Sequence, residues 1–502
     1  MDRSRGQTAD RLLPDPQSAS NVTHNPDRSR LYELAAPEGE RTAFGSIAFR
    51  SAVRSRSADQ TKNALDDPFD QADEELMRAA FRAVGEREML CIDRQMGRHA
   101  PHNYVCRYFV PREYARIALS LAQLLEPAPA GVPPDFITVQ LPDHDRTAIR
   151  IDPERGLTAV LGTDYTGEAK KSFLRLFMYH VKRAGGLGLH AGSKRIRLRT
   201  NEGPLETVTQ LFLGLSATGK STLTAHGYFL EGPEHTTVVQ DDVCGLLPDG
   251  TVVGSEGEGM YVKTAGLDPA IQPALYEAVT HESTVLENVV VEADGAVDLD
   301  ADRYTANGRA SIRRDVLTSA DPDIDIYHVD QLFFITRNPV MPPVAKLDPD
   351  EAAAAFMLGE SIETSAGDPD RAGEAVRVVG TNPFIIGPPG DEGNRFRELV
   401  ARNDIDCYVL NTGELGDGGR DIRVEDTVTL LREIARGRVT WTESPESGLT
   451  VPEAVPGFDV EAFRVEDYVP NLETRLRELR AERRSYLEGF DHLDPAIVEA
   501  VY

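Results

Sequence analysis

Apolar residues in the first part of the chain alternate between helical spacing and short continuous runs. Residues 73–84 place Leu76, Ala80 and Val84 on one side of a helix, which predicts an amphipathic α-helix. Two further segments have helical patterns, and the second stops at Gly185 and Gly186, as helices often do. These two helices are expected at residues 111–125 and 172–184. Short apolar runs predict strands at residues 89–92, 104–110 and 157–161.

Short apolar runs become more frequent after residue 186, where we place the main domain boundary. They predict strands at residues 196–199, 208–213, 236–239, 283–291 and 332–336. The last third alternates a strand with helices, at residues 407–410, 425–436 and 472–487. This order predicts an α/β fold with mixed sheets. The expected parts are a poorly ordered polar segment, a first domain and a second domain, at residues 1–30, 31–186 and 187–502.

Composition excludes several classes of protein. The chain has 502 residues, 40% of them apolar, but no apolar run approaches the roughly 18 residues of a membrane span. Its net charge of −28 comes from acidic residues spread along the chain, which repel a phosphate backbone, so nucleic acid is not an expected partner. The four cysteines are scattered and form no CxxC pair. The sequence therefore predicts a cytoplasmic protein without a disulfide framework, a zinc site or a secretory signal.

Lysine is scarce in this chain. Only eight of the 54 basic residues are lysines. Dispersed Asp and Glu with little Lys suit solubility at high ionic strength, where charge repulsion is screened. We expect a salt-adapted protein, the alternative being a merely acidic one.

One segment fits the phosphate-loop pattern GxxxxGK[ST]. An apolar run leads into it and a helix-compatible stretch follows it, as in nucleotide-binding proteins. Glycines let backbone N–H groups point at phosphate, the lysine would reach the β and γ phosphates, and the serine hydroxyl would bind Mg²⁺. The segment consists of Gly214, Leu215, Ser216, Ala217, Thr218, Gly219, Lys220 and Ser221. It predicts nucleotide binding.

A β-branched run at residues 236–239 precedes two acids, Asp241 and Asp242. Paired carboxylates at the end of a strand beside a phosphate loop suit hard cations. Acid pairs also occur as plain turn formers, so this reading stays open on the local pattern alone.

Together, the loop and the acid pair resemble the ATP-type phosphoenolpyruvate carboxykinases. Further stretches resemble that family in the same order, and the resemblance extends over roughly residues 98–427. These stretches are residues 161–171, 256–264, 286–291, 341–347 and 411–413.

The resemblance implies a bilobal fold with a substrate lobe first and the phosphate loop in the C-terminal lobe. It implies conversion of oxaloacetate and ATP to phosphoenolpyruvate, ADP and CO₂, in the gluconeogenic direction. By resemblance, Lys171, His190 and Asp242 would bind Mn²⁺, in addition to the Mg²⁺ that accompanies ATP. A lysine ligand must first lose its proton.

The resemblance also implies roles for residues outside the metal site. Arg98, Tyr165, Lys171 and Arg309 would bind the substrate, Lys171, Lys220, Lys263 and Arg309 would be catalytic, and Arg420 and Thr427 would flank the adenine. Residues 363–376 are expected to form a lid, the alternative being an ordinary acidic surface loop.

Three of the eight lysines, Lys171, Lys220 and Lys263, stand at such positions. Arginine cannot replace a lysine that must deprotonate, so their retention supports the carboxykinase reading. Two alternatives remain. One is a kinase of the same fold acting on a protein serine or a small hydroxyl compound, and the other is a nucleotide sensor without turnover.

Overall fold

The computed structural model describes residues 13–52, 57–201, 203–215, 218–305, 308–362 and 375–502. They fold into two compact units, each built from separate stretches of the chain. The first unit contains the described residues up to Arg183, together with Val253–Thr318 and Phe384–Gly387. The second contains Ala184–Val252, Ser319–Pro383 and Pro388–Tyr502. Both contain helices and mixed sheets, which confirms the predicted α/β class.

The first unit is built on a mixed sheet of eight strands. Its order is β1-β5-β6-β8-β10-β9-β4, with β7 paired to β5. The bounds are β1 Val22–His24, β4 Thr61–Asn63, β5 Met89–Met96, β6 Tyr104–Pro111, β7 Glu126–Pro127, β8 Phe136–Leu141, β9 Ala148–Asp152 and β10 Leu157–Leu161. Strand β6 pairs parallel with β8 and antiparallel with β5, so the sheet is mixed as predicted.

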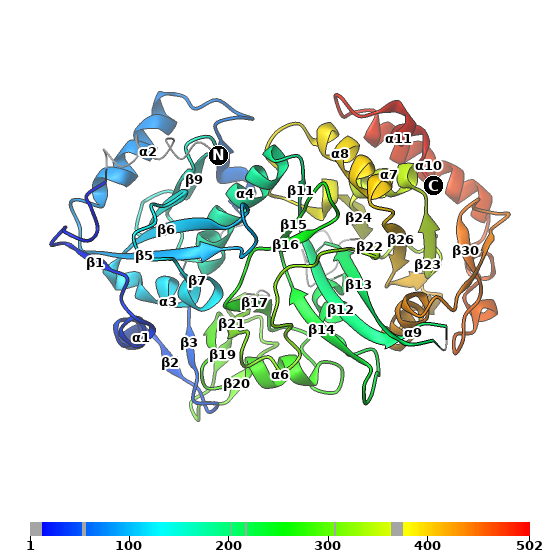
Figure 1. Ribbon diagram of the computed structural model, residues 1–502, viewed down its shortest axis with the longest axis horizontal. Helices are drawn as coiled ribbons and strands as arrows, with labels where there is room; N and C mark the ends of the chain where they lie inside the picture. Colours follow the sequence, from blue (N-terminus) through cyan, green and yellow to red (C-terminus); the bar gives the residue numbers. More distant parts are fainter. Residues whose placement is uncertain (1–12, 53–56, 202, 216–217, 306–307, 363–374) are drawn as a thin grey trace. The chain divides into compact units, whose positions relative to one another are not determined.

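Helices cover both faces of this sheet (Figure 1). They are α1 Arg28–Ala35, α2 Gln71–Ala83, α3 Ala115–Leu124 and α4 Thr166–Arg183. Cys91, Phe109 and Val139 pack with Phe81 of α2 in one buried core. Because side chains alternate along a strand, Thr138 points to the opposite face, where its hydroxyl lies 2.8 Å from that of Ser172 in α4.

A second, five-stranded sheet completes the first unit, in the order β17-β21-β18-β3-β2. Its strands are β2 Glu40–Arg41, β3 Ile47–Phe49, β17 Gly259–Lys263, β18 Val285–Glu287 and β21 Arg309–Arg313. Helix α6 Pro273–Val279 and the pair β19 Val290–Val291 and β20 Val297–Asp298 also belong to this region. The parallel pairing of β18 with β3 joins the later stretch of chain to the earlier one.

The second unit has its own eight-stranded mixed sheet, in the order β14-β12-β13-β22-β26-β23-β30-β29. Strands β13, β22 and β26 are parallel, and the other neighbouring pairs are antiparallel. The bounds are β12 Ala191–Arg199, β13 Leu205–Leu213, β14 His235–Gln240, β22 Gln331–Thr336, β23 Val344–Leu347, β26 Asp406–Asn411, β29 Thr440–Glu443 and β30 Thr450–Ala454.

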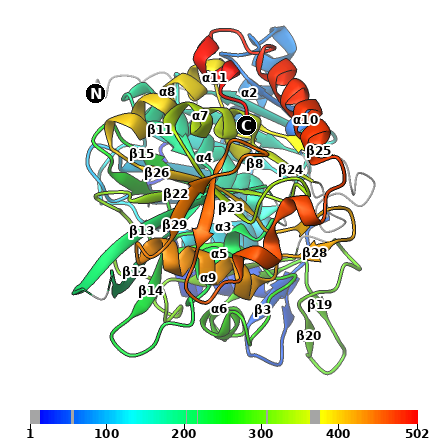
Figure 2. The ribbon, with the colours of Figure 1, turned by 90° about the vertical axis from the view of Figure 1, so that its right-hand side faces the viewer.

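Helices again cover both faces of the sheet, as Figure 2 shows for α7 and α9. Phe333 and Leu410 share a core with Leu431 of α9, whereas Phe334 faces Phe396 of α8 on the other side. The helices are α5 Lys220–Ala225, α7 Pro349–Leu358, α8 Pro389–Arg402, α9 Val424–Ala435, α10 Leu472–Leu487 and α11 Pro495–Glu499. Shorter strands are β11 Leu187–Leu189, β15 Cys244–Leu246, β24 Glu360–Ile362, β25 Ala375–Arg377, β27 Glu414–Leu415 and β28 Arg420–Asp421. Strand β16 Val252–Gly254 lies where the chain passes from the second unit to the first.

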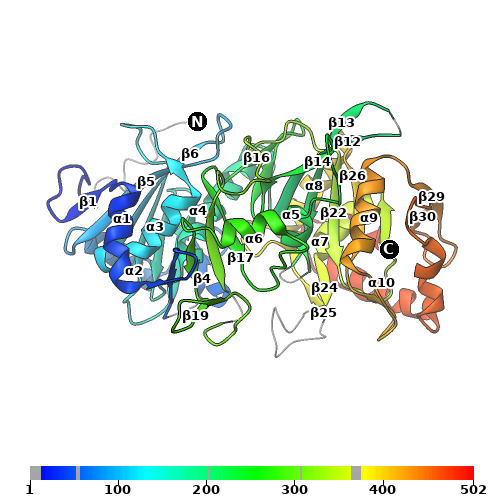
Figure 3. The ribbon, with the colours of Figure 1, turned by 90° about the horizontal axis from the view of Figure 1, so that it is seen from below.

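Several local expectations differ from the structure. Residues 13–30 are ordered, because Val22–His24 forms β1, paired with β5 at the edge of its sheet (Figure 3). Helix α4 begins at Thr166, six residues before the expected residue 172; its first turns contain buried polar residues, so apolar spacing did not reveal them. The single strand expected at 283–291 is wrong: Asn288 has a φ of 61°, which separates β18 from β19. Among the described residues, no helix combines the length and apolar character needed to span a bilayer.

Candidate active site

The phosphate loop follows β13 and leads into α5. Gly214 fits because a Cβ there would lie 2.6 Å from Oγ1 of Thr218. Gly219, the residue before α5, has a φ of 100°, a backbone region that favours glycine. Ser216 and Ala217 lie outside the described residues. Both glycines of the motif are therefore required by the local structure.

The loop is closed by side-chain hydrogen bonds. The Thr218 hydroxyl donates to the carbonyl oxygen of Leu215 at 2.8 Å. The Thr412 hydroxyl, just beyond β26, donates to the carbonyl oxygen of Thr218 at the same distance. Thr412 was not among the predicted site residues, although it lies in a stretch, 411–413, that resembles the family.

The two acids after β14 have different partners. Oγ of Ser221 donates to Oδ2 of Asp241 at 3.3 Å. Nζ of Lys220 lies 4.0 Å from Oδ1 of Asp242. A register shift in the pairing of β14 with β12, between Ser193 and Lys194, skips one residue of β14 shortly before these acids and so helps to aim them. The structure thus brings the predicted lysine, serine and acid pair together in one unit.

His190 directly precedes β12, and its imidazole is held from both sides. Nδ1 lies 2.6 Å from the carbonyl oxygen of Thr381, and Nε2 lies 3.0 Å from Oδ1 of Asp242. Because a carbonyl only accepts, this contact assigns a proton to Nδ1 and leaves the Nε2 lone pair towards Asp242 in the neutral ring. Two such atoms 3.0 Å apart need a positive charge between them, which either a second ring proton or a metal ion can supply. When Nε2 carries no proton, the pair can bind a divalent metal, with Thr381 orienting the ligand.

In the first unit, cationic side chains gather around β17 and β21. Lys263 and Arg309 are directly opposite each other in the antiparallel pairing of these strands. Nε of Arg309 donates to the Tyr165 hydroxyl at 3.3 Å. Nζ of Lys171 lies 5.7 Å from the centre of the Tyr165 ring. Four residues predicted from widely separated segments thus lie in one region, where positive charge attracts anions despite the acidic chain.

The charge of this cluster affects its own members. Burial, and after it the positive charge of Arg309, lowers the pKa of Lys263. A bound anion would relieve the repulsion between Lys263 and Arg309, because it attracts both charges. The two neighbouring positive charges therefore favour the binding of a negatively charged ligand.

Buried polar residues form hydrogen bonds and ion pairs next to the cationic cluster. The Tyr261 hydroxyl donates to the Glu287 carboxylate, which also accepts from the backbone N of Thr166 at 3.2 Å. Arg116, with a side chain 4% exposed, donates to Asp164 at 2.6 Å and lies 3.4 Å from Glu287. Sequence reasoning missed these supporting residues because an isolated Arg or Glu gives no local signal of burial.

Lys171 and Arg175 lie on the same side of α4 and share one carboxylate. Nζ of Lys171 lies 3.2 Å from Oε1 of Glu168, and Nη1 of Arg175 lies 3.8 Å from Oε2. The Glu168 side chain is completely buried. Glu168 thus holds Lys171 in place one helical turn away, and it was also absent from the predicted site.

Arg98 lies in the first unit beside Glu126. Its Nε and Nη2 donate to Oε1 of that glutamate at 3.0 and 2.9 Å, and Nη2 also reaches the carbonyl oxygen of Gly257 at 3.1 Å. These bonds fix the plane of the guanidinium.

The two residues predicted to flank the adenine both lie in the second unit. The Arg420 guanidinium stacks over the Phe463 ring, 4.1 Å from its centre. Thr427 is buried in α9, and its hydroxyl donates to the carbonyl oxygen of Arg423 at 3.2 Å. Their role towards a nucleotide stays a prediction.

The predicted metal triad is divided between the units: Lys171 belongs to the first, and His190 and Asp242 belong to the second. The three-residue site therefore stays a prediction. The expected lid at 363–376 falls on residues outside the described part of the chain, except for its last two residues in β25.

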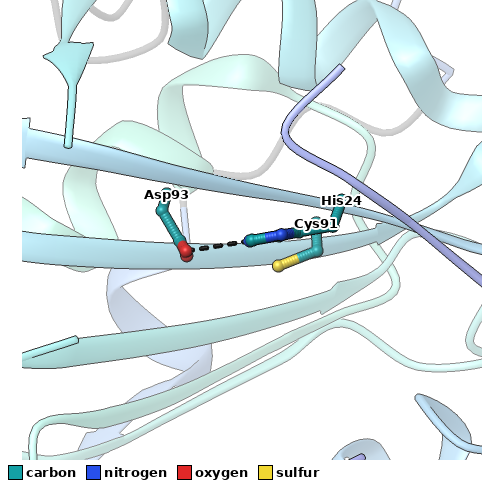
Figure 4. Close-up of side chains that lie close together, drawn as sticks. All are labelled: His24, Cys91 and Asp93. Atoms are coloured by element: carbon teal, nitrogen blue, oxygen red, sulfur yellow. Dashed lines mark hydrogen bonds and ion pairs between the residues drawn. The ribbon is translucent and has the colours of Figure 1, made fainter. Parts of the chain in front are cut away.

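Another group of metal-binding residue types lies on the paired strands β1 and β5 of the first unit (Figure 4). His24, Cys91 and Asp93 have ligand atoms within 4.8 Å of one another. However, Asp93 already accepts two hydrogen bonds from Arg107, at 2.7 and 2.9 Å, and one from His24 at 2.9 Å. Burial also raises the pKa of the Cys91 thiol well above its usual value. This cluster ties β1 to β5 and is a poor metal site, because a guanidinium occupies the place of the cation.

Comparisons with known proteins agree with the geometry. The sequence model of the family described as "Phosphoenolpyruvate carboxykinase" matches residues 20–461. The "Phosphoenolpyruvate carboxykinase (ATP)" of Aeropyrum pernix is 34% identical over 486 residues, which cover 95% of this chain and 96% of that protein. The protein of the same name from Rhizobium rhizogenes is 29% identical over 482 residues, or 88% and 86% of the two chains.

The match thus extends over both units and includes the phosphate loop, the acid pair and the cationic cluster. The chain belongs to the ATP-dependent phosphoenolpyruvate carboxykinase family.

Proposed function

We propose that this protein converts oxaloacetate and ATP to phosphoenolpyruvate, ADP and CO₂. The observation that carries the proposal is the cluster of Lys263, Arg309, Tyr165 and Lys171 in the first unit. A kinase that phosphorylates a hydroxyl group needs the phosphate loop and its acids, but its acceptor does not require this cationic cluster. A dianionic keto acid needs cations and hydrogen-bond donors of this kind.

The nucleotide side of the reaction would use the phosphate loop. Lys220 would contact the β and γ phosphates, and Ser221 with Asp241 would hold the Mg²⁺ that accompanies ATP. Arg420 and Thr427 would flank the adenine.

A second ion, Mn²⁺, would be held by Lys171, His190 and Asp242. The Nε2 lone pair and the carboxylate oxygen of the last two already converge at 3.0 Å. Imidazole, carboxylate and neutral amine suit this metal. When bound, the ions would polarise the keto oxygen and neutralise phosphate charge.

The chain's own residues would act on the substrate in two steps. Arg98 and Tyr165 would hold oxaloacetate while its C–C bond breaks, CO₂ leaves and the electron pair passes to the enolate oxygen. That oxygen then forms a bond to the γ phosphorus, and the bond from this phosphorus to the β–γ bridging oxygen breaks, which releases ADP. Arg309, Lys263 and Lys220 would offset the negative charge that spreads over the transferred group.

The cellular setting is part of the same proposal. Acidic residues spread along the chain and only eight lysines support a salt-adapted protein of the cytoplasm. The same negative charge disfavours nucleic acid as a partner. The gluconeogenic direction, in which phosphoenolpyruvate is the product, is part of the proposal.

One assay separates the proposal from its alternatives. The purified protein is incubated with oxaloacetate, ATP and Mn²⁺ in high salt, and phosphoenolpyruvate is measured. Its formation together with ADP and CO₂ supports the proposal. No phosphoenolpyruvate but ATP-dependent labelling of another acceptor would instead indicate a kinase, and ATP binding without turnover would indicate a sensor.

A further inference from the structure

Lys194, on strand β12, is a lysine whose whole side chain is buried. Its Nζ donates to the carbonyl oxygen of Leu223 at 3.0 Å and to that of His226 at 2.5 Å. The same Nζ lies 3.9 Å from the centre of the Tyr228 ring. All three partners belong to α5, the helix after the phosphate loop, or to the turn that follows it.

These surroundings match an ammonium group. Such a group has three N–H donors, and here it meets two carbonyl oxygens and the negative face of an aromatic ring. Burial nevertheless lowers the pKa of Lys194 well below its usual value, because water no longer solvates the charge. A buried lysine is therefore costly at this place, and apolar packing alone does not account for it.

The carbonyl groups that Lys194 binds lie at the end of α5 opposite to the phosphate loop. The last carbonyls of a helix lack partners within the helix, so a cation there both satisfies and orients them. Because α5 has six residues, it is only about 9 Å long. A shift of its last turn would therefore also move Lys220 and Ser221 in its first turn.

Strand β12 contacts α5 at a second point. A Cβ at Gly192 would lie 2.1 Å from Oγ1 of Thr224, so helix and strand are too close for any side chain there. Gly192 and Lys194 are two residues apart and lie on the same face of the strand. His190, directly before β12, is a further two residues away. Strand β12 therefore sets the position of α5 and is directly preceded by His190, the residue that contacts Asp242.

The turn after α5 has a strained backbone and is held in place by hydrogen bonds. Tyr228 and Phe229 have φ values of 56° and 53°, in the left-handed region that bulky residues rarely adopt. The buried Tyr228 hydroxyl donates to Oε1 of Gln210 in β13 at 2.7 Å, and its backbone N donates to Nδ1 of His226 at 2.9 Å. Strain of this kind persists only where the surroundings enforce it.

We propose that Lys194 is a positioning residue for nucleotide binding. It fixes the far end of α5 and thereby sets where Lys220 and Ser221 stand relative to His190 and the acid pair. It does not touch the nucleotide. This inference rests on the proposed function only in that the phosphate loop binds ATP.

The test replaces Lys194 by an apolar residue of similar length and measures ATP binding directly. In Lys194→Met, equilibrium dialysis with labelled Mg-ATP is expected to show a Kd raised at least about tenfold, because the phosphate contacts are displaced. The KM for oxaloacetate should stay the same and unfolding should remain cooperative. Lys346→Met is the matched control, because that lysine is half-exposed and pairs with Asp406 on the surface. An ATP Kd in Lys194→Met equal to that of the control would overturn the proposal, whatever the change in Tm.

A second route covers the case in which Lys194→Met does not fold. Gly192→Ala pushes against Thr224 and should raise the ATP Kd in the same way. Gly192→Ala with Thr224→Ala removes the clashing Oγ1 and should recover most of the affinity. Wild-type ATP affinity in Gly192→Ala would count against the proposal, because the position of α5 on β12 would then have no effect on ATP binding. If the wild-type protein binds ATP but forms no phosphoenolpyruvate, the proposed function fails, while these Kd comparisons still decide the role of Lys194.

Discussion

Lys263 and Arg309 lie opposite each other in the antiparallel pair of β17 and β21, so two positive charges share one register position. On its other side in the sheet, Arg309 is paired with Glu287 of β18. Like charges opposite each other destabilise a sheet. The fold tolerates this repulsion in the cluster of the first unit that is proposed to bind anionic ligands.

Removing one of these charges should separate activity from stability. In Lys263→Met, kcat/KM should fall at least about 100-fold because the transferred phosphoryl group loses a cation. The Tm should stay the same or rise, since a repulsive pair is gone. Phosphoenolpyruvate formation and thermal unfolding measure the two effects. Arg313→Met, in the neighbouring strand β21 but paired with Asp315, is the control that should keep its activity. Full activity in Lys263→Met would contradict the role given to this lysine.

Substitution of the two neighbouring acids should impair different binding steps. Asp242 contacts His190, whereas Asp241 accepts from Ser221. Asp242→Asn should weaken Mn²⁺ binding in the absence of nucleotide by about 10- to 100-fold. Asp241→Asn should leave that binding intact and instead raise the KM for Mg-ATP. Electron paramagnetic resonance of free Mn²⁺ gives the first quantity and steady-state kinetics the second. Identical losses in both variants would show that the acids do not have separate roles.

A buried ion cluster predicts a pH-dependent stability. Oε1 of Glu360 accepts from Nη2 of Arg483 at 2.8 Å, and Oε2 accepts from Nη2 of Arg377 at 2.9 Å. Burial opposes ionisation, but the charge of Arg483 and the other partners outweigh it and lower the pKa of Glu360 to about 2. A lowered pKa means that this stabilisation is complete above the unfolded value of about 4.3 and is lost as the pH falls towards 2.

Glu360→Gln should therefore cost about 3–5 kcal/mol of unfolding free energy at neutral pH, because it leaves Arg483 buried without its counter-charge. Urea unfolding at several pH values measures this. The difference between wild type and variant should shrink as the pH falls from about 5 to about 3. Asp406→Asn, which breaks a half-exposed pair with Lys346, should cost no more than about 1 kcal/mol. A loss in Glu360→Gln as small as in this control would refute the argument.

Salt should stabilise the folded protein. A net charge of −28 repels itself, and the screening length falls from about 10 Å at about 0.1 M salt to about 3 Å at about 1 M. We expect the Tm to rise by several degrees between about 0.1 M and about 2 M KCl. An unchanged or lower Tm would remove the support for salt adaptation.

Local sequence pattern predicted the bounds of some elements well. The strand at residues 157–161 and the helix at residues 472–487 match β10 and α10 at both ends. For these two elements the pattern of apolar residues was enough to predict the type and bounds of the element. The same holds for the phosphate loop, whose glycines are required by the close approach at Gly214 and the positive φ at Gly219.

Elements that depend on distant partners could not be predicted in this way. The first turns of α4 contain Glu168 and Lys170, whose burial is set by contacts elsewhere in the unit, so apolar spacing gave no sign of a helix there. The break at Asn288 depends on its side chain accepting from the backbone N of Ser51, 237 residues away. The His190 ring is oriented by the backbone carbonyl of Thr381, and no side-chain motif can reveal a contact to a backbone atom.

The most direct test of the carboxykinase account is the Lys171→Arg variant, assayed for Mg-ATP binding and for phosphoenolpyruvate formation from oxaloacetate, ATP and Mn²⁺. Arginine keeps the positive charge but cannot supply a neutral amine. The account predicts that ATP affinity stays at the wild-type level while phosphoenolpyruvate formation disappears. Formation of phosphoenolpyruvate at the wild-type rate by this variant would contradict it.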